Sequence, residues 1–356
     1  MAPYGAGRLR GQRRRMDRRR GSGYLWPMAR NSYYTGPTSD HFDGTRFFIR
    51  GATRDKTRGE VLRWMAGRKR APWPKHAPSP FHDHPPARVE GEALRVTLVG
   101  HATFLVQTEG LNILIDPVWS KRASPVQWAG PLRVNPPGIA FENLPRLDAV
   151  LVSHNHYDHL DMATLSALTR RDAPRVITPL GNDAIMWRSD RSIDAQAHDW
   201  GARVPLNGRL AVHLEPAYHW SARGLGDHRM ALWCAFVIET PAGAIYHIAD
   251  TGWGAGAIFS AVREKYGPPR LAMIPIGAYE PRWFMGEQHV DPEEALRIFQ
   301  LCGARRAVGH HWGTFQLTDE PIDEPERRLH AALDEAGIDR KLFHAMRPGE
   351  SMDVPT

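Results

Sequence analysis

A short apolar strand pattern, DAVLVS, leads directly into residues 154–159, which hold three histidines and one aspartate. A loop that leaves a strand end is held by a rigid scaffold and stays open to a ligand. In an extended loop, His154 and His156 project to the same side and can bind one ion. Asp158 and His159 follow as the chain turns, and can face a second ion. A single histidine would be an ordinary hydrogen-bonded side chain, but the four residues together predict a metal site.

The rest of the chain alternates apolar strand patterns with helical patterns in two successive halves. Strands are expected at 93–99, 102–107, 111–115, 149–153 and 175–178, and again near 211–215, 230–239, 244–249, 271–275 and 306–309. Helices are expected at 161–171, 254–264, 292–301 and 323–336. This order predicts an α/β fold in which two sheets lie between layers of helices, an αββα four-layer sandwich.

Charge and composition divide the chain into three parts. Residues 1–20 hold eight arginines and one aspartate, so the remainder of a chain with a formal net charge of +7 is neutral. We interpret 1–30 as a disordered basic tail, because it lacks the interleaved aromatic residues of a nucleic-acid binding segment. Residues 31–90 are expected to form an extended arm that packs on the core, with one helix at 59–67. Residues 91–350 form the domain that carries the metal motif.

Cysteine and apolar content bear on the compartment. The chain has two cysteines, Cys234 and Cys302, which do not make a disulfide framework. No apolar stretch approaches the roughly 18 residues of a membrane span, and no signal-peptide core follows the basic start. A cytoplasmic protein is expected, with peripheral membrane association as an open alternative.

Further ligand candidates each follow an apolar run in the second half of the chain. They are His219, Asp250, and either His310 or His311, between which the residues alone do not choose. A polar residue often caps a strand, but repeated occurrence at strand ends favours a shared site. Imidazole and carboxylate ligands without cysteine are typical of an open zinc site, with iron or manganese as alternatives.

The order HxHxDH, a lone His, a lone Asp and a final His resembles that of metallo-β-lactamase-fold hydrolases. Within them, the chain is similar to the N-acylphosphatidylethanolamine-hydrolysing phospholipase D branch. The similarity rests on SHNHYDHLD (153–161), HW (219–220), DTG (250–252), IGAYEPRWFMGEQHVDPEE (276–294) and HWGTF (311–315). It covers roughly residues 31–320, and the 276–294 run is more specific than the metal motif.

The resemblance implies a site of two zinc ions in the hydrolase domain, 91–350. It assigns His154, His156 and His219 to one ion and Asp158, His159 and His311 to the other, with Asp250 bridging both. It also selects His311 rather than His310. Water activated between the ions would attack a phosphodiester, so Asp158 and Asp250 are the predicted catalytic residues.

The resemblance also implies a phospholipid substrate, cleaved to phosphatidic acid and an N-acylethanolamine. Predicted substrate contacts are His289, Arg282, Trp283 and Trp220, with surface ion pairs or core packing as alternatives.

Two further polar residues at strand edges are expected to support the ligands. Asp116 is expected to accept an imidazole N–H from one of them, although a loop cap beside Pro117 explains it equally well. His101 is a second supporting candidate, for which a packed structural histidine is favoured.

Several functions stay open beside phospholipid hydrolysis. The same fold could act on another phosphodiester or a lactone, or as a nuclease. Nucleic acid is not an expected partner, because no basic run lies between the ligand candidates. A non-enzymatic membrane-associated or nucleic-acid-associated metal protein is the alternative from a different class. We also keep a homodimer open.

Overall fold

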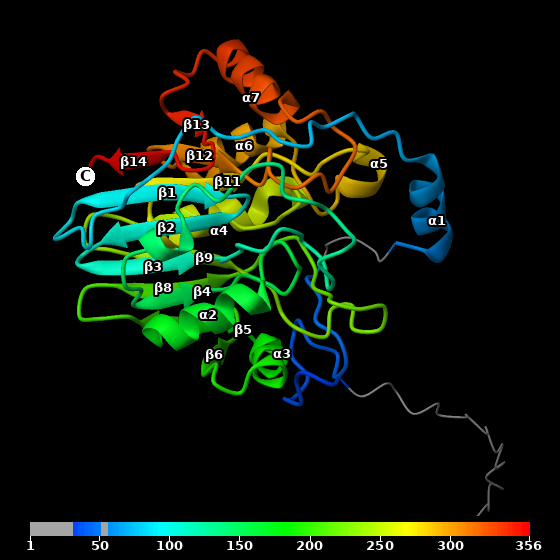
Figure 1. The fold of residues 1–356 in the computed structure, drawn as a ribbon, viewed down its shortest axis with the longest axis horizontal. Coiled ribbons are helices and arrows are strands. Elements are labelled where there is room, and N and C mark those ends of the chain that lie inside the picture. Colours follow the sequence, from blue (N-terminus) through cyan, green and yellow to red (C-terminus); the bar gives the residue numbers. More distant parts are fainter. Residues whose placement is uncertain (1–30, 51–55) are drawn as a thin grey trace, which may run out of the picture. The chain divides into compact units, whose positions relative to one another are not determined.

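The computed structural model describes residues 31–50 and 56–356 of the chain. Residues 1–30, predicted as a basic tail, lie outside the described residues. The described chain forms two seven-stranded sheets that pack face to face, with helices on their outer faces (Figure 1). The predicted αββα sandwich is confirmed.

The first sheet is built from strands of the first half of the chain and one C-terminal strand. They are β1 (Leu94–Gly100), β2 (Thr103–Thr108), β3 (Leu111–Ile115), β4 (Ala149–Leu151), β5 (Arg175–Pro179), β6 (Ala195–His198) and β14 (Ser351–Val354). β1, β2 and β3 form an antiparallel meander, and β4, β5 and β6 continue parallel to β3. β14 pairs antiparallel with β1 at the other edge.

The second sheet is built entirely from the second half of the chain. Its strands are β7 (Arg203–Pro205), β8 (Ala211–Glu215), β9 (Ala235–Glu239), β10 (Ile245–His247), β11 (Leu271–Pro275), β12 (Ala307–His310) and β13 (Phe343–Ala345). β7 to β10 pair antiparallel in order, and β10 to β13 are parallel. Parallel strands end at one edge of a sheet, which brings the loops after β10, β11 and β12 together.

The helices cover the outer faces of the sheets or stand in the loops. They are α1 (Arg58–Gly67), α2 (Met162–Asp172), α3 (Asn182–Ser189), α4 (Ala257–Tyr266), α5 (Arg282–Met285), α6 (Pro292–Cys302) and α7 (Glu324–Glu335), with short 3₁₀ turns at Phe141–Asn143 and Gly254–Gly256. Residues of α2 and α3 join the apolar layer outside the first sheet. Residues of α4, α6 and α7 join the layer outside the second.

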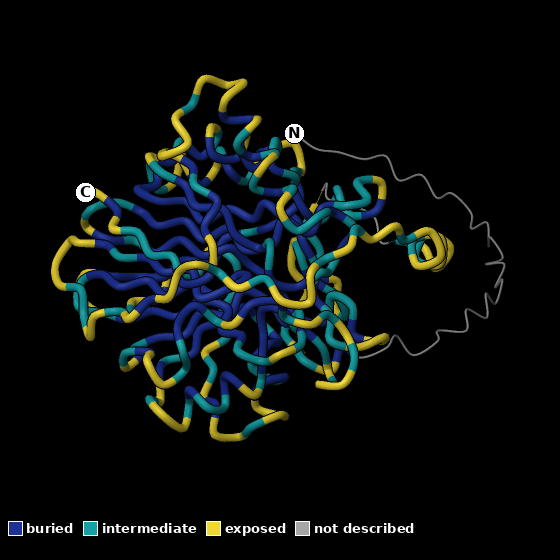
Figure 2. The backbone as a smooth tube through the Cα atoms, turned by 45° about the horizontal axis from the view of Figure 1, so that its top comes forward, coloured by how far each residue is buried: buried dark blue, intermediate teal, exposed yellow. Residues whose placement is uncertain are grey.

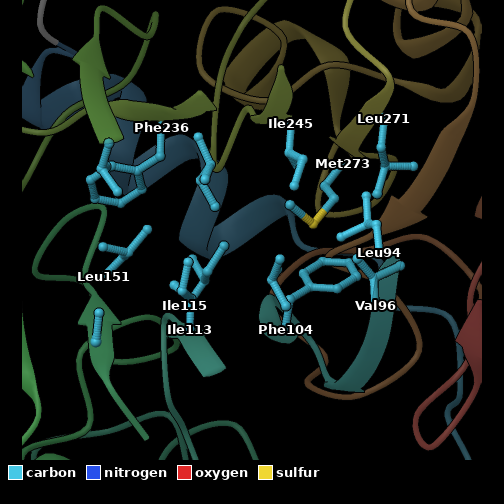
Figure 3. Packing of buried hydrophobic residues seen from close by; sticks show 14 of the residues in the cluster. Leu94, Val96, Phe104, Ile113, Ile115, Leu151, Phe236, Ile245, Leu271 and Met273 are labelled. Carbon is cyan, nitrogen blue, oxygen red and sulfur yellow. The ribbon is translucent and has the colours of Figure 1, made fainter. Parts of the chain in front are cut away.

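The main apolar core lies between the two sheets (Figure 3). Successive side chains of a strand point to opposite faces. Phe104 and Val106 of β2 therefore meet Phe236 and Met273 of the second sheet, whereas Leu105 lies in the layer that includes α2. Because both faces of each sheet are covered, the central strands, such as β3, β4 and β11, are nearly continuous apolar runs rather than alternating ones.

Helix α6 has a well-defined start, which fixes the segment before it. Asp291 accepts a hydrogen bond from the Glu294 backbone N–H at 2.9 Å, and the Glu294 carboxylate accepts one from the Asp291 N–H at 3.2 Å. This reciprocal pair is a capping box, which stabilises a helix N-terminus. The helix ends at Gly303 in the left-handed region, φ 66°.

The N-terminal arm runs over the surface of the sandwich and is attached at several points. Phe42 and Phe47 pack against Trp233. Further along, the Ala71 N–H donates to the Asp319 carbonyl at 2.9 Å and the Asp83 N–H donates to the Gly138 carbonyl at 3.0 Å. Figure 2 shows mostly buried backbone in the strands and extensive exposure in the arm. No helix in 31–50 or 56–356 is long and apolar enough to cross a membrane.

The structure corrects several expected elements. The strand predicted at 230–239 begins only at Ala235, because the residues before it form a loop whose N–H groups bond to the segments that follow β4 and β5. The Cys234 N–H, for example, donates to the Ser153 carbonyl. Helices α3 and α5 and the four edge strands β6, β7, β13 and β14 were not predicted. Their short sequences lack a clear apolar period, and tertiary packing fixes them instead.

Candidate metal centre

Loops that leave five strand ends meet at one edge of the sandwich. Residues 154–159 follow β4, His219 follows β8, Asp250 follows β10 and His311 follows β12. Asp116 follows β3 directly. The structure thus brings together all seven residues predicted as metal ligands. They form two neighbouring groups, and within each group the ligand atoms lie within 4.8 Å of one another.

The first group consists of three imidazoles and the Asp250 carboxylate. His156 Nδ1 lies 3.0 Å from His154 Nε2 and 3.2 Å from His219 Nε2. Asp250 Oδ2 lies 3.6 Å from His219 Nε2 and 3.9 Å from His154 Nε2. Nitrogen ligands about 2.0–2.1 Å from a tetrahedral zinc are separated by roughly 3.3 Å, close to these spacings.

Hydrogen bonds on the far side of two rings fix which nitrogens carry lone pairs. His219 Nδ1–H donates to the Gln288 carbonyl at 3.1 Å. His154 Nδ1–H donates at 2.9 Å to Ser153 Oγ, whose own proton goes to Asp116 at 2.6 Å. The Nε2 atoms of His154 and His219 therefore both present lone pairs to His156 Nδ1, which can donate to only one of them. Such convergence of lone pairs suits a bound cation.

The second group places two imidazoles against two carboxylates. His159 Nδ1–H donates to Asp116 at 2.8 Å, so its Nε2 lone pair faces Asp250 at 3.3 Å and Asp158 at 3.7 Å. His311 Nε2 lies 3.1 Å from Asp250 and 3.3 Å from Asp158. A lone pair directed at carboxylates is repulsive unless a proton or a metal ion lies between them.

The pKa shifts show how strongly this region favours positive charge. Burial lowers the pKa of His311, but Asp250 and Asp158 outweigh it and raise that pKa to about 9. Burial likewise opposes a charged His159, yet the same carboxylates and Asp116 hold its pKa well above the ordinary value. Burial lowers the pKa of His156 to about 4 in the first group, which leaves that ring neutral and able to bind a metal.

Asp250 stands between the two groups, with each oxygen directed at a different set of partners. Oδ1 faces His311, while Oδ2 faces His159, His219 and His154. Burial alone would raise the pKa of Asp250, but His311 and His159 hold it well below its usual range. It is a buried carboxylate that faces both groups of donor atoms.

Asp116 makes the hydrogen bond that was expected of it. Fully buried, it accepts from His159 Nδ1–H, from Ser153 Oγ–H at 2.6 Å and from the Ser153 N–H at 2.7 Å. One carboxylate thereby orients His159 directly and His154 through Ser153. Its backbone lies at φ 44°, a conformation that costs energy for a non-glycine residue and is retained where surrounding structure demands it.

His101 does more than pack. Its Nε2 lies 3.0 Å from Asp158 Oδ2, and burial lowers its pKa to about 3, so a neutral ring donates its proton to that carboxylate. On its other side, the ring packs edge-on against Phe315, with 5.2 Å between centroids. His101 therefore holds Asp158 in the orientation in which it faces His159 and His311.

Replacement of Asp116 by Asn is expected to weaken metal binding about 10- to 100-fold, because the amide keeps one acceptor oxygen and its NH2 group faces the donors that the other carboxylate oxygen serves. Competition with a chromophoric chelator measures the affinity. Exposed Asp194 provides the matched Asp194→Asn control, which should bind metal like the wild type. Unchanged affinity in a folded Asp116→Asn protein would contradict this role.

The predicted substrate contacts are placed in different surroundings. His289 joins Asp250 and His311 in a third group of neighbouring donor atoms, and Trp220 packs edge-on against His156 at 4.5 Å. Arg282 instead holds its own segment, donating to the His289 carbonyl at 2.7 Å and to Glu294 at 2.6 Å. Trp283 is 47% exposed on α5, outside the metal groups.

Several residues around the site escaped the sequence analysis. Ser153 and the Gln288 carbonyl orient His154 and His219, and only the position of Ser153 next to a ligand could have suggested a role. His310, the rejected alternative to His311, is fully buried and stacks on His247 at 5.3 Å between centroids. It is not a member of the groups of donor atoms around Asp250.

A family model described as a β-lactamase superfamily domain matches residues 111–312, more than half of the chain and nearly all of the residues above. The chain belongs to the metallo-β-lactamase superfamily. It is a metal-dependent hydrolase of that superfamily, with His and Asp groups that can hold metal.

Two relatives with similar sequences are both phospholipases D. The chain is 40% identical to N-acyl-phosphatidylethanolamine-hydrolyzing phospholipase D 1 of Caenorhabditis elegans, over 68% of this chain and 70% of that protein. It is 32% identical to the mitochondrial N-acyl-phosphatidylethanolamine-hydrolyzing phospholipase D of Saccharomyces cerevisiae, over 69% of this chain and 53% of that protein.

Two solved structures share the fold of this chain. An isothiocyanate hydrolase from Delia radicum gut bacteria has a TM-score of 0.59 at 22% identity, covering 72% of this chain and 98% of that one. The metallo hydrolase Igni18 of Ignicoccus hospitalis has a TM-score of 0.55 at 22% identity, covering 74% of this chain and 99% of that one.

Proposed function

We propose that this metallo-β-lactamase superfamily protein is a phospholipase D-type phosphodiesterase that hydrolyses N-acylphosphatidylethanolamine to phosphatidic acid and an N-acylethanolamine. The observation that carries the reaction class is the pair of donor groups that share Asp250. The identity with the Caenorhabditis elegans phospholipase D supports the substrate.

The donor groups fit two divalent ions, which we propose to be zinc, with iron or manganese as alternatives. His154, His156 and His219 would hold one ion, and Asp158, His159 and His311 the other, with Asp250 shared. When bound, two such ions supply an activated water and neutralise the charge of a phosphoryl group.

The chain's own residues orient the reacting groups. Asp250 is the proposed proton acceptor at the centre, because it is a buried carboxylate whose oxygens face both ligand sets. His289 Nδ1 lies 3.9 Å from Asp250 and has no hydrogen-bond partner among the described residues. Burial lowers the pKa of His289 to about 4, so a neutral ring is available to hydrogen-bond a phosphoryl oxygen. Arg282 fixes that ring by holding the His289 carbonyl.

The substrate test compares three compounds with the metallated protein. N-acylphosphatidylethanolamine in detergent micelles should release phosphatidic acid and N-acylethanolamine in equal amounts, measured by mass spectrometry. We expect a kcat/KM at least about tenfold above that for bis(4-nitrophenyl) phosphate, since an enzyme favours the substrate whose remote groups it binds. Turnover of the generic diester or of a lactone, without lipid turnover, would reject N-acylphosphatidylethanolamine as the substrate. It would still be consistent with a metal-dependent hydrolase.

A further inference from the structure

Large apolar side chains are exposed on four separate segments that lead into residues around the metal centre. We call them the apolar rim: Leu62 and Met65 on α1, Trp283 on α5, and the loop residues Leu225 and Trp128. Their exposed fractions are 65%, 61%, 47%, 109% and 82%, respectively. Burial of such side chains is favourable, so several at one site of a soluble domain indicate an interaction surface.

Helix α1 presents its apolar residues outward because its other face is already occupied. Trp64 stacks on Phe284 of α5, with 4.7 Å between centroids and 4° between planes. Leu62 and Met65, three residues apart, share the opposite face. No residue of α1 is buried, and Figure 2 shows the helix standing off the buried strands. Figure 1 places α1 and α5 at the same end of the domain.

Helix α5, on which α1 packs, is followed directly by residues of the metal centre. Phe284, on which Trp64 stacks, lies in the short helix α5, and the next turn of chain carries the His289 N–H to the Met285 carbonyl at 3.0 Å. His289 and the adjacent Gln288 carbonyl contact Asp250 and His219, as described above. The surface of α1 and α5 is therefore a few residues from the reacting groups.

The loop that carries Leu225 is equally well anchored at its base. Asp227 accepts hydrogen bonds from the Gly224 N–H at 2.8 Å and the Arg223 N–H at 3.1 Å. The Arg223 guanidinium donates to the carbonyls of Asn155 and Leu160, both at 2.9 Å, at the metal-binding run. A rigid base thus presents a fully exposed leucine next to the site.

Trp128 lies on a fourth segment, which is connected to the same centre. The loop around it is closed by the bridges Arg122–Leu132 and Arg133–Phe315. Phe315 packs against His101, which holds Asp158. All four segments of the apolar rim are therefore connected to residues that surround the predicted ligands.

Positive charge is concentrated around α1. Residues 56–75 contain seven lysines or arginines and one acidic residue, whereas the chain beyond residue 20 is neutral overall. Lys56 and Arg68 pair with Glu287 and Asp319. Arg58, Arg63, Lys69 and Arg70 are exposed, which leaves a cationic surface interleaved with the apolar side chains.

We propose that the apolar rim and the cationic flanks of α1 dock the protein on the surface of an anionic phospholipid bilayer, with the metal centre facing the lipid. This inference rests on the proposed function, since docking on the bilayer would bring the metal centre to the phosphodiester of a membrane lipid. Apolar side chains enter the interface and lysine or arginine attracts anionic headgroups, which is how peripheral proteins bind membranes. A second copy is a poorer occupant, because a two-fold interface would bring two cationic α1 segments together.

The test is co-sedimentation of the full metallated chain with vesicles of phosphatidylcholine, with and without phosphatidylglycerol. We expect stronger binding to the anionic vesicles, and at least about tenfold weaker binding for the triple variant Leu62→Ser/Met65→Ser/Leu225→Ser. Its metal content and melting temperature should equal those of the wild type. The arginine-rich tail is the same in both proteins, and raising the salt concentration screens its contribution.

Leu342→Ser is the matched control. Leu342 is 37% exposed and precedes β13, which is parallel to β12, so it lies at the edge of the sheet opposite the metal centre. This variant should bind vesicles like the wild type.

Three outcomes would overturn the docking surface. They are equal vesicle binding by the triple variant and the wild type, no vesicle binding by either, and a wild-type dimer that the triple substitution dissociates. Lipid in detergent micelles needs no docking surface, so absence of turnover there rejects the proposed function while the vesicle result still decides the docking surface.

Discussion

Replacement of Asp250 by Asn should lower kcat/KM by at least about 1000-fold and reduce the metal content of the purified protein. Loss of a metal from a phosphodiesterase removes several kcal/mol of charge stabilisation, and about 4 kcal/mol corresponds to that factor. The Asp250 carboxylate lies 3.1 Å from His311 and 3.6 Å from His219, which belong to different ligand groups. The neutral amide supplies one weaker oxygen ligand and cannot serve both groups.

Steady-state kinetics and elemental analysis of the same preparations measure these effects. Asp194→Asn at an exposed position is the control, and it should retain both activity and about two metal ions per chain. Asp250→Asn with unchanged activity and full metal content would remove Asp250 from the centre. A wild type with one ion per chain and no hydrolysis would favour a structural metal protein.

Removal of the metal should abolish hydrolysis and lower the melting temperature by roughly 10 °C. A ligand that binds only the folded state at about 1000 times its Kd stabilises that state by about 4 kcal/mol. One kcal/mol corresponds to roughly 2–4 °C for domains of comparable size. The physical cause is the concentration of buried carboxylates and imidazole lone pairs around Asp250, which the metal neutralises.

Differential scanning fluorimetry before and after dialysis against a chelator measures the shift. Zinc, iron or manganese is then added back separately, and the ion that restores both stability and activity is the functional one. Full activity in protein shown to be metal-free by elemental analysis would contradict the proposed centre.

The local sequence predicted the parts of the fold that depend on local pattern. Helix α6 is an example, since Asp291, Pro292 and Glu294 mark its start and an apolar period follows. The strands predicted for the first sheet also match the observed ones, because short apolar β-branched runs bounded by turns are typical of buried strands. Elements without such a pattern, such as α5 and β6, were missed.

The local sequence also predicted the first half of the site. Three histidines and an aspartate directly after β4 have few roles other than metal binding, whatever lies opposite them. For the second half, the residues alone left His310 and His311 equal. The structure separates them, because His310 ends β12 and stacks on His247, whereas His311 follows the strand with φ 65° and faces Asp158 and Asp250.

By itself, then, the sequence determined the residue types of the metal centre and the layers of the sandwich, since both follow from short-range spacing. Only the tertiary structure decided which atoms converge. The tautomers of His154 and His219 depend on Ser153 and on the Gln288 carbonyl, and the tie between His159 and the first sheet depends on Asp116. The apolar rim likewise exists only after α1 packs on α5, because which side of a helix is left exposed is set by a partner far away in the chain.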